Sequence, residues 1–412
     1  MLRPAVPCLI MVSFSLLLGC ALPAAQPQLA PATPMAATAE TSQPVMEEPV
    51  TPPAAEPPAP DPPVSLTLMA VGDIMGHQEQ LDAAWNPKTQ SYEFAPFFQK
   101  VAPLLQEADW VVGNLETTLA GKEALYAGYP QFNTPESLAD TLRDTGFTAV
   151  TTANNHSLDR REAGVLATLD HLDRAGLLHT GTFRSPEERD QPLVLEKDGI
   201  RLAILAYTYG TNGIPLPKGK PYLVNLMDPE LMKADISRAR ALDVDLVMVS
   251  LHFGSEYQRQ PNAAQKKAAD ICLQAGADLI IGHHPHVVQP YEWRTVTLPD
   301  GTEHTGFVAY SLGNFISAQR WDYKDVGAIL KLQITKEAGE TRVEQVELIP
   351  TYVHFYRKAG KRQYVIYPLP LTLAADAPPD PLISSDLKRY MDRLYRETSI
   401  HVVSLESSKQ KQ

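Results

Sequence analysis

The chain has 412 residues and a formal net charge of −12, and 44% of its residues are hydrophobic. The acidic balance argues against nucleic acid as a partner, and the length allows one large domain with an extension or two domains. Cys8 and Cys20 lie near the amino terminus, which leaves Cys272 alone in the rest of the chain. No disulfide framework is therefore available, and the body must be held together by its hydrophobic core.

Residues 1–20 are predicted to be a secretory signal. Arg3 precedes an apolar run over residues 9–18 that is too short for a helix to span a membrane. The sequence Leu17-Leu18-Gly19-Cys20 resembles the lipobox of bacterial lipoproteins, in which the cysteine becomes the lipidated first residue. An ordinary signal peptide with an incidental cysteine is the alternative. We expect a cell-envelope protein, anchored to the membrane through lipid on Cys20 and facing the periplasm or the exterior.

Residues 21–64 are predicted to be a disordered tether, because residues 21–63 hold 13 prolines among many alanines and almost no aromatic residue. The remaining chain is divided into a folded domain over residues 65–375 and a helical extension over residues 376–412. The basic run at residues 357–362 is interpreted as a solvated hairpin.

The domain alternates predicted strands with predicted helices, which favours an α/β fold with parallel strands. In chain order we predict strand 65–71, helix 94–108, strand 110–112, helix 135–144, strand 149–152, helix 162–175, strand 201–206, helix 229–242, strand 246–251, helix 261–275, and strands 279–281, 307–311, 327–334 and 343–349. Irregular strand at 351–373 and a terminal helix at 386–398 follow.

Metal-competent side chains fall directly after these strands, and they are Asp73, Asn114, Glu116, Asn155, His156, His252, His284 and His286. The carboxyl ends of parallel strands share one edge of a sheet, where ligands characteristically bind. Taken singly, each residue could be a cap, a turn residue or a core histidine. Taken together, they predict a metal site at that edge.

The mixed oxygen and nitrogen donors suit two divalent metal ions such as Mn, Zn or Fe, and they do not favour calcium or a thiolate site. Two ions bridged by a carboxylate stabilise both the attacking and the leaving oxygen of a displacement. Glu116 is the natural bridge.

Five motifs in order resemble the CapA family of capsule (poly-γ-glutamate) synthesis proteins, a branch of the calcineurin-like metallophosphoesterase superfamily. They are Gly72-Asp73-Ile74-Met75, Asn114-Leu115-Glu116, Asn154-Asn155-His156-Ser157-Leu158-Asp159, His284-Pro285-His286 and Leu312-Gly313-Asn314-Phe315. The resemblance covers about residues 66–320. It implies a four-layer α/β/β/α sandwich of the metallo-dependent phosphatase type with a dimetal centre.

The resemblance also implies roles for single residues. The first metal would be held by Asp73 and His286, the second by Asn155, His252 and His284, with Glu116 between them. The implied catalytic residues are His156, as proton donor, and Asp159. The wider superfamily has Asp-x-His in its first motif, whereas Ile74 and Met75 follow Asp73 here, so whether His77 reaches a metal stays open.

Substrate contacts are predicted at Asn114, Asn154, Tyr207, Tyr209, Asn212 and Asn314. Tyr207, Tyr209 and Asn212 are placed on a glycine-punctuated loop at the same edge, where ordinary loop packing is the alternative.

The leading hypothesis is a lipid-anchored, metal-dependent hydrolase that acts in the synthesis, release or surface attachment of an anionic capsular polymer such as poly-γ-glutamate. One alternative is a phosphoesterase acting on a nucleotide, lipid or polysaccharide phosphate of the envelope. Another is a non-catalytic polymer-binding or scaffold component of an export complex.

Overall fold

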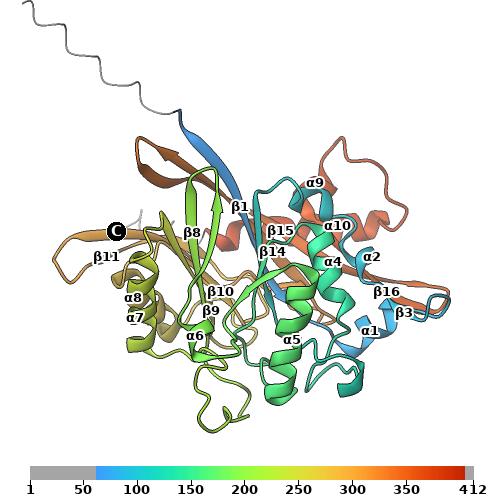
Figure 1. Ribbon diagram of the computed structural model, residues 1–412. Helices are drawn as coiled ribbons and strands as arrows, with labels where there is room; N and C mark the ends of the chain where they lie inside the picture. The colour runs from blue at the N-terminus through green and yellow to red at the C-terminus, as the bar shows by residue number, and fades with distance from the viewer. Residues whose placement is uncertain (1–61, 404–412) are drawn as a thin grey trace, which may run out of the picture. The chain divides into compact units, whose positions relative to one another are not determined.

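The computed structural model describes residues 62–403 (Figure 1). The predicted signal, Cys20 and nearly all of the predicted tether lie outside the described residues, as do residues 404–412. Within residues 62–403, no helix combines the length and the apolar character needed to cross a bilayer.

The first sheet has the strand order β16-β15-β14-β1-β4-β5-β6, and β13 also pairs with β1. The strands β1, β4, β5 and β6 are parallel, and β14, β15 and β16 add an antiparallel wing. The bounds are β1 Val64–Ile74, β4 Trp110–Leu115, β5 Ala149–Thr151, β6 Leu178–Thr180, β13 Asn314–Ile316, β14 Val326–Glu337, β15 Glu340–Lys358 and β16 Lys361–Pro368.

The second sheet has the order β11-β12-β10-β9-β8-β7, in which the four inner strands are parallel and the two edge strands are antiparallel. The bounds are β7 Leu193–Lys197, β8 Ile200–Thr208, β9 Leu246–His252, β10 Leu279–His283, β11 Tyr291–Thr297 and β12 Glu303–Ala309. A small separate hairpin joins β2 Trp85–Asn86 to β3 Ser91–Tyr92.

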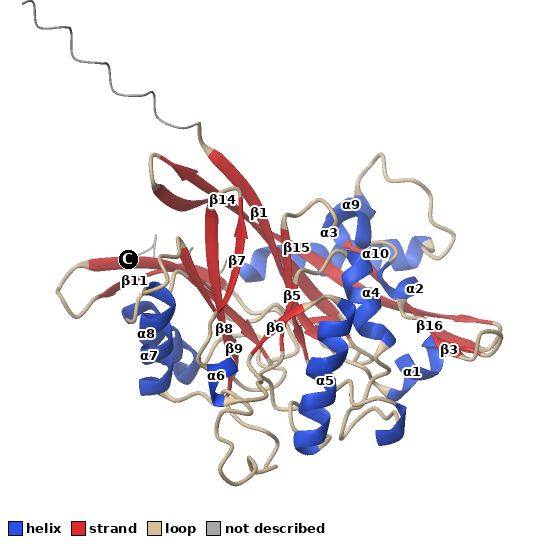
Figure 2. Cartoon of the chain, in the orientation of Figure 1, coloured by secondary structure: helices blue, strands red, loops and turns tan. Residues whose placement is uncertain are grey.

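Helices cover the outer faces of the two sheets (Figures 1 and 2). The α-helices are α1 Gln78–Ala84, α2 Ala95–Phe98, α3 Ala102–Leu105, α4 Ser137–Thr145, α5 Arg161–Ala175, α6 Pro186–Arg189, α7 Pro229–Arg240, α8 Ala263–Gln274, α9 Leu369–Leu373 and α10 Ser385–Val402, with a 3-10 turn at Lys122–Ala124.

Within residues 62–403 there are four apolar clusters, and the alternation of side chains along the strands creates the three larger ones. Residues such as Leu68 of β1 and Ile204 of β8 face each other between the sheets. Met69, the neighbour of Leu68, points to the opposite face and packs beneath α2, α3 and α4. Ala203, next to Ile204, faces α7 and α8, and the fully buried Cys272 of α8 lies in the same core. The layers therefore run helix, sheet, sheet, helix, which confirms the predicted α/β/β/α sandwich.

Two predicted elements differ in the structure. The helix expected over residues 94–108 is broken into α2 and α3, because Pro96 and Pro103 lack the N–H that a continuous helix requires and each lies at the start of its own short helix. The irregular strand expected over residues 351–373 is instead the regular β15–β16 hairpin followed by α9. The basic run lies at the tip of that hairpin, as interpreted from the sequence.

The terminal helix α10 packs on the body. One face of the helix buries Met391, Leu394 and Val402 in the core that lies between the two sheets. The opposite face is polar. Apolar residues at helical spacing thus give this helix one face that packs on the body.

Two glycines allow the strand ends to meet closely. A Cβ atom on Gly72 would lie 1.9 Å from the carbonyl oxygen of Gly313, and one on Gly282 would lie 2.0 Å from the carbonyl oxygen of Tyr310. No other residue fits at either position. Gly72 precedes Asp73 and Gly282 precedes the histidine cluster, so both glycines bring polar side chains to the carboxyl ends of the strands.

Candidate metal centre

The histidine cluster begins where β10 ends. His283 is the last residue of the strand, and His284 and His286 follow on either side of Pro285 with left-handed φ angles of 95° and 58°. Such backbone in non-glycine residues costs on the order of 1–3 kcal/mol each and is found mainly at functional sites. The backbone N–H of His284 donates to Asp73 Oδ2 at 3.3 Å, which fixes the turn against the end of β1.

The first group of candidate ligands contains Asp73, Glu116 and His286, whose ligand atoms lie within 4.8 Å of one another. His286 Nδ1 is 3.1 Å from Asp73 Oδ2, and its Nε2 is 3.8 Å from Glu116 Oε1. All three side chains are buried. They come from β1, from the residue after β4 and from the loop after β10.

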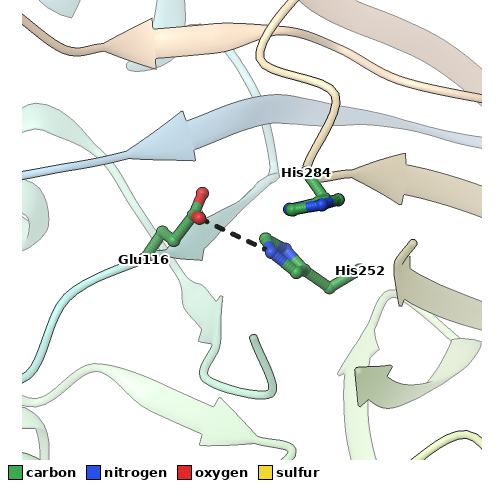
Figure 3. A group of neighbouring side chains, drawn as sticks. All are labelled: Glu116, His252 and His284. Carbon is green, nitrogen blue, oxygen red and sulfur yellow. Dashed lines mark ion pairs between the residues drawn. The ribbon is translucent and has the colours of Figure 1, made fainter. Parts of the chain in front are cut away.

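The second group contains Glu116, His252 and His284, again with ligand atoms within 4.8 Å of one another. Figure 3 shows the carboxylate of Glu116 directed at the two imidazoles, with His252 Nε2 at 3.5 Å from Glu116 Oε1. Asn155 Oδ1 lies 2.8 Å from the same nitrogen of His252. The amide oxygen predicted for the second metal is therefore placed with this group, and Glu116 is the member common to both groups.

Burial and neighbouring charge set the ionisation of these groups. Burial, followed by the charge of Asp73, raises the pKa of Glu116 well above its usual value. Burial alone would raise the pKa of Asp73, but hydrogen bonds from His283 and His286 hold it well below its usual value. Burial lowers the pKa of His284 to about 4 and that of His252 well below 6.5. These two imidazoles are therefore neutral at pH about 7, the form that binds a metal.

The pattern of unsatisfied atoms fits a divalent cation. Both carboxylate oxygens of Glu116 and Nδ1 of His284 are buried without a hydrogen-bond partner. Leaving such groups unpaired is costly, and each is a natural metal ligand. Carboxylate, amide and imidazole donors together suit Mn, Zn or Fe. That two ions are held stays a prediction.

The predicted catalytic pair lies beside these groups. His156 Nδ1 is 2.7 Å from Asp159 Oδ2, which also accepts the backbone N–H of Phe132 at 2.7 Å. The ring of Phe132 packs edge-on against the imidazole with centroids 4.6 Å apart. Asp159 thus orients the imidazole through Nδ1, and Nε2 takes no part in that bond.

A cavity of about 610 Å³ adjoins the pair. It is lined by His156 and Asp159 together with Asn155, Asn212 and Glu256, among others. The amide of Asn155 donates to Asn212 Oδ1 at 3.1 Å. Residues predicted to act on a substrate therefore face a space large enough to hold part of one.

Four of the six residues predicted to contact a substrate have buried side chains, and one of them lies in a strand instead of the expected loop. Tyr207 lies within β8 instead of in the loop, and its hydroxyl donates to Asp235 in the outer core. The others are buried and bonded to the protein: Asn114 to Asp73 and His252, Asn154 to the carbonyl of Leu115, and Asn314 to the carbonyls of His286 and Lys324. These asparagines position the candidate ligands and their loops.

The remaining two predicted contacts lie at the opening of the site. Tyr209 is half exposed and packs on His284, with ring centroids 4.7 Å apart. Asn212 lines the cavity described above. Both positions are accessible to a substrate.

Three further residues change the picture drawn from the sequence. Nδ1 of His283, a residue given no role above, lies 3.4 Å from Asp73 Oδ1. His77 belongs to none of the candidate ligand groups found within residues 62–403; its Nδ1 lies 3.3 Å from Gln80 Oε1, and its ring packs on Phe132. Glu256 was not predicted, although it forms a third group with His284 and His286.

Comparisons with known proteins agree with the motifs. The model of the family described as bacterial capsule synthesis protein PGA_cap matches residues 67–319. The chain is 30% identical over 256 residues to the PGA biosynthesis protein CapA of Bacillus subtilis, a match that covers 61% of this chain and 64% of that protein. It is 29% identical over 293 residues to the capsule biosynthesis protein CapA of Bacillus anthracis, covering 69% of this chain and 67% of that protein.

Among solved structures, the calcineurin-like phosphoesterase YfkN from Bacillus subtilis aligns with 70% of this chain and 91% of its own, at 17% identity and a TM-score of 0.40. The fold of the chain follows from its strand order and its three cores, independently of that modest similarity.

Proposed function

We propose, from the premise that this chain belongs to the bacterial capsule synthesis protein PGA_cap family, that it is a metal-dependent hydrolase acting on an anionic capsular polymer such as poly-γ-glutamate. The observation that carries the proposal is Glu116, a residue common to two groups of candidate ligands, whose two buried oxygens have no hydrogen-bond partner. Because the chain spans about two thirds of the curated relatives, its activity and substrate are inferred separately from theirs.

The proposed reaction is hydrolysis of a bond in the polymer or in its attachment to the envelope. Asp73, His286, Glu116, Asn155, His252 and His284 would hold the ions. A pair of divalent ions supplies an activated water and stabilises the charge that develops on the scissile group. His156, oriented by Asp159, would protonate the leaving group through Nε2. Tyr209 and Asn212 would contact the substrate at the opening.

The test uses the full chain in detergent, stripped with a chelator and reconstituted with Mn. It is offered γ-glutamyl oligomers and, separately, phosphomonoesters and phosphodiesters. Cleavage of the oligomers that is lost on chelation and restored by Mn supports the proposal. Phosphate release without oligomer cleavage favours a phosphoesterase of the envelope, and metal-dependent polymer binding without cleavage favours a scaffold role. Either of these two results overturns the proposal.

Membrane attachment through Cys20 is the second part of the proposal, and it rests on the lipobox-like sequence before that cysteine. We expect Cys20→Ser to move the protein from the membrane fraction to the soluble envelope fraction, because the acyl chains attached to Cys20 would be lost. Fractionation and labelling with an alkyne fatty acid measure both effects. Cys272→Ser, which removes a buried thiol of the core, is the control and should keep the label. Equal labelling of wild type and Cys20→Ser contradicts lipidation.

A further inference from the structure

Glu256 lies on the exposed side of the candidate metal centre. It is four residues beyond His252 and lines the cavity that also contains His156. One of its carboxylate oxygens and one nitrogen each of His284 and His286 lie within 4.8 Å of one another. The two histidines belong to different buried groups, so Glu256 approaches both groups from the open side.

The loop that carries Glu256 is fixed to the loop that carries the histidines. The N–H of Tyr257 donates to the carbonyl of Pro285 at 2.8 Å, and the N–H of Phe253 donates to the carbonyl of His283 at 3.1 Å. Gly254 has a φ of 103°, and Tyr257 has a φ of 65°, a conformation that is uncommon outside glycine. The backbone on both sides of Glu256 is therefore held in place.

The two buried groups supply few ligands for the ions they would hold. Each contains three ionisable side chains, and Glu116 is shared between them. Zn in proteins binds four ligands, and Mn commonly takes six with oxygen donors. A carboxylate facing His284 and His286 from the open side would complete such a set. The unpaired Nδ1 of His284 is a second, independent sign that a ligand belongs between these side chains.

We propose that Glu256 is a further metal ligand that closes the open side of the centre. The inference rests on the proposed function, because it requires a metal there. Glu256 is exposed, whereas the other carboxylates of the centre, Asp73 and Glu116, are fully buried. It can therefore leave the metal when an anionic group of the substrate arrives, while Asp73 and Glu116 stay in place.

The test measures metal content and not activity. Full-length wild type and Glu256→Gln are equilibrated with a series of buffered Mn concentrations, and bound metal is measured by mass spectrometry. We expect the apparent Kd for one ion to rise about tenfold or more in Glu256→Gln. Glu256→His, which replaces one ligand by another, should bind more tightly than Glu256→Gln. Glu344→Gln is the matched control. Glu344 is an exposed glutamate of β15 and lies at the other end of the first sheet from Asp73.

The outcomes separate the two proposals. If Glu256→Gln binds metal as wild type and Glu344→Gln do, the role of Glu256 is overturned and the proposed function is untouched. If wild type itself binds no metal at any concentration, the proposed metal-dependent function falls, and the role of Glu256 falls with it.

Discussion

Replacing Glu116 by glutamine is expected to abolish metal binding and at the same time to make the metal-free protein more stable. The side chain is fully buried, and neither of its oxygens has a hydrogen-bond partner. In the metal-free protein this carboxyl group is an unsatisfied buried acid, a burden of about 1–3 kcal/mol or more. Glutamine has nearly the same shape but no charge, and its amide oxygen binds a metal ion more weakly than a carboxylate does.

The pH dependence follows from the raised pKa of Glu116. A carboxyl group whose pKa is raised on folding contributes stability below its usual value of 4.5, and that stability is lost as the pH rises through the raised value. The advantage of Glu116→Gln in chelator-treated protein should therefore grow as the pH rises above 4.5. The difference in unfolding temperature between wild type and Glu116→Gln is measured at a series of pH values, with chelator or with Mn.

A second buried glutamate provides the control. Glu292 accepts the hydroxyl of Tyr310 at 2.8 Å and lies 3.1 Å from the guanidinium of Arg294, so its charge is satisfied. Glu292→Gln should lower the unfolding temperature and leave metal binding unchanged. If Glu116→Gln destabilises the chelator-treated protein as much as Glu292→Gln does, Glu116 is a structural acid and not a metal ligand.

The residues of the centre could be predicted because the residues directly before them in the sequence indicate where each strand ends. Buried runs such as residues 279–281 mark a strand, and Gly282 with the following histidines marks its end. The parallel alternation then places the ends together. The strand pattern alone could not show that they come from two facing sheets, because strand pairing joins residues far apart in the chain; only the family resemblance implied the two sheets. The edge strand β11 was missed for a different reason: it pairs with the next strand in the chain, β12, but only Glu292 and Val296 of its seven residues are buried.

The errors have equally specific causes. The strand predicted over residues 201–206 ends two residues too early, so Tyr207 was assigned to a loop although it follows the alternation of Ala203 and Leu205 into the outer core. Its partner, Asp235, lies on α7 and gives no local signal. Glu256 was missed because an exposed acid four residues after His252 looks like any surface residue until the loop's bonds to Pro285 are known.

Replacing His156 by asparagine is expected to lower kcat by about 10²–10⁴-fold while both metal content and folding are retained. The imidazole belongs to none of the ligand groups found within residues 62–403; its Nδ1 is engaged by Asp159, and the residue faces the cavity. Asp159→Asn should lower kcat less, since it disturbs the orientation of the ring and keeps the ring itself. Hydrolysis of γ-glutamyl oligomers, the proposed substrate, is measured beside bound metal. His171→Asn is the control, because His171 bonds the carbonyl of Leu119 and is not among the residues that line the cavity. Loss of metal in His156→Asn would make this histidine a ligand, and unchanged kcat would remove it from the reaction.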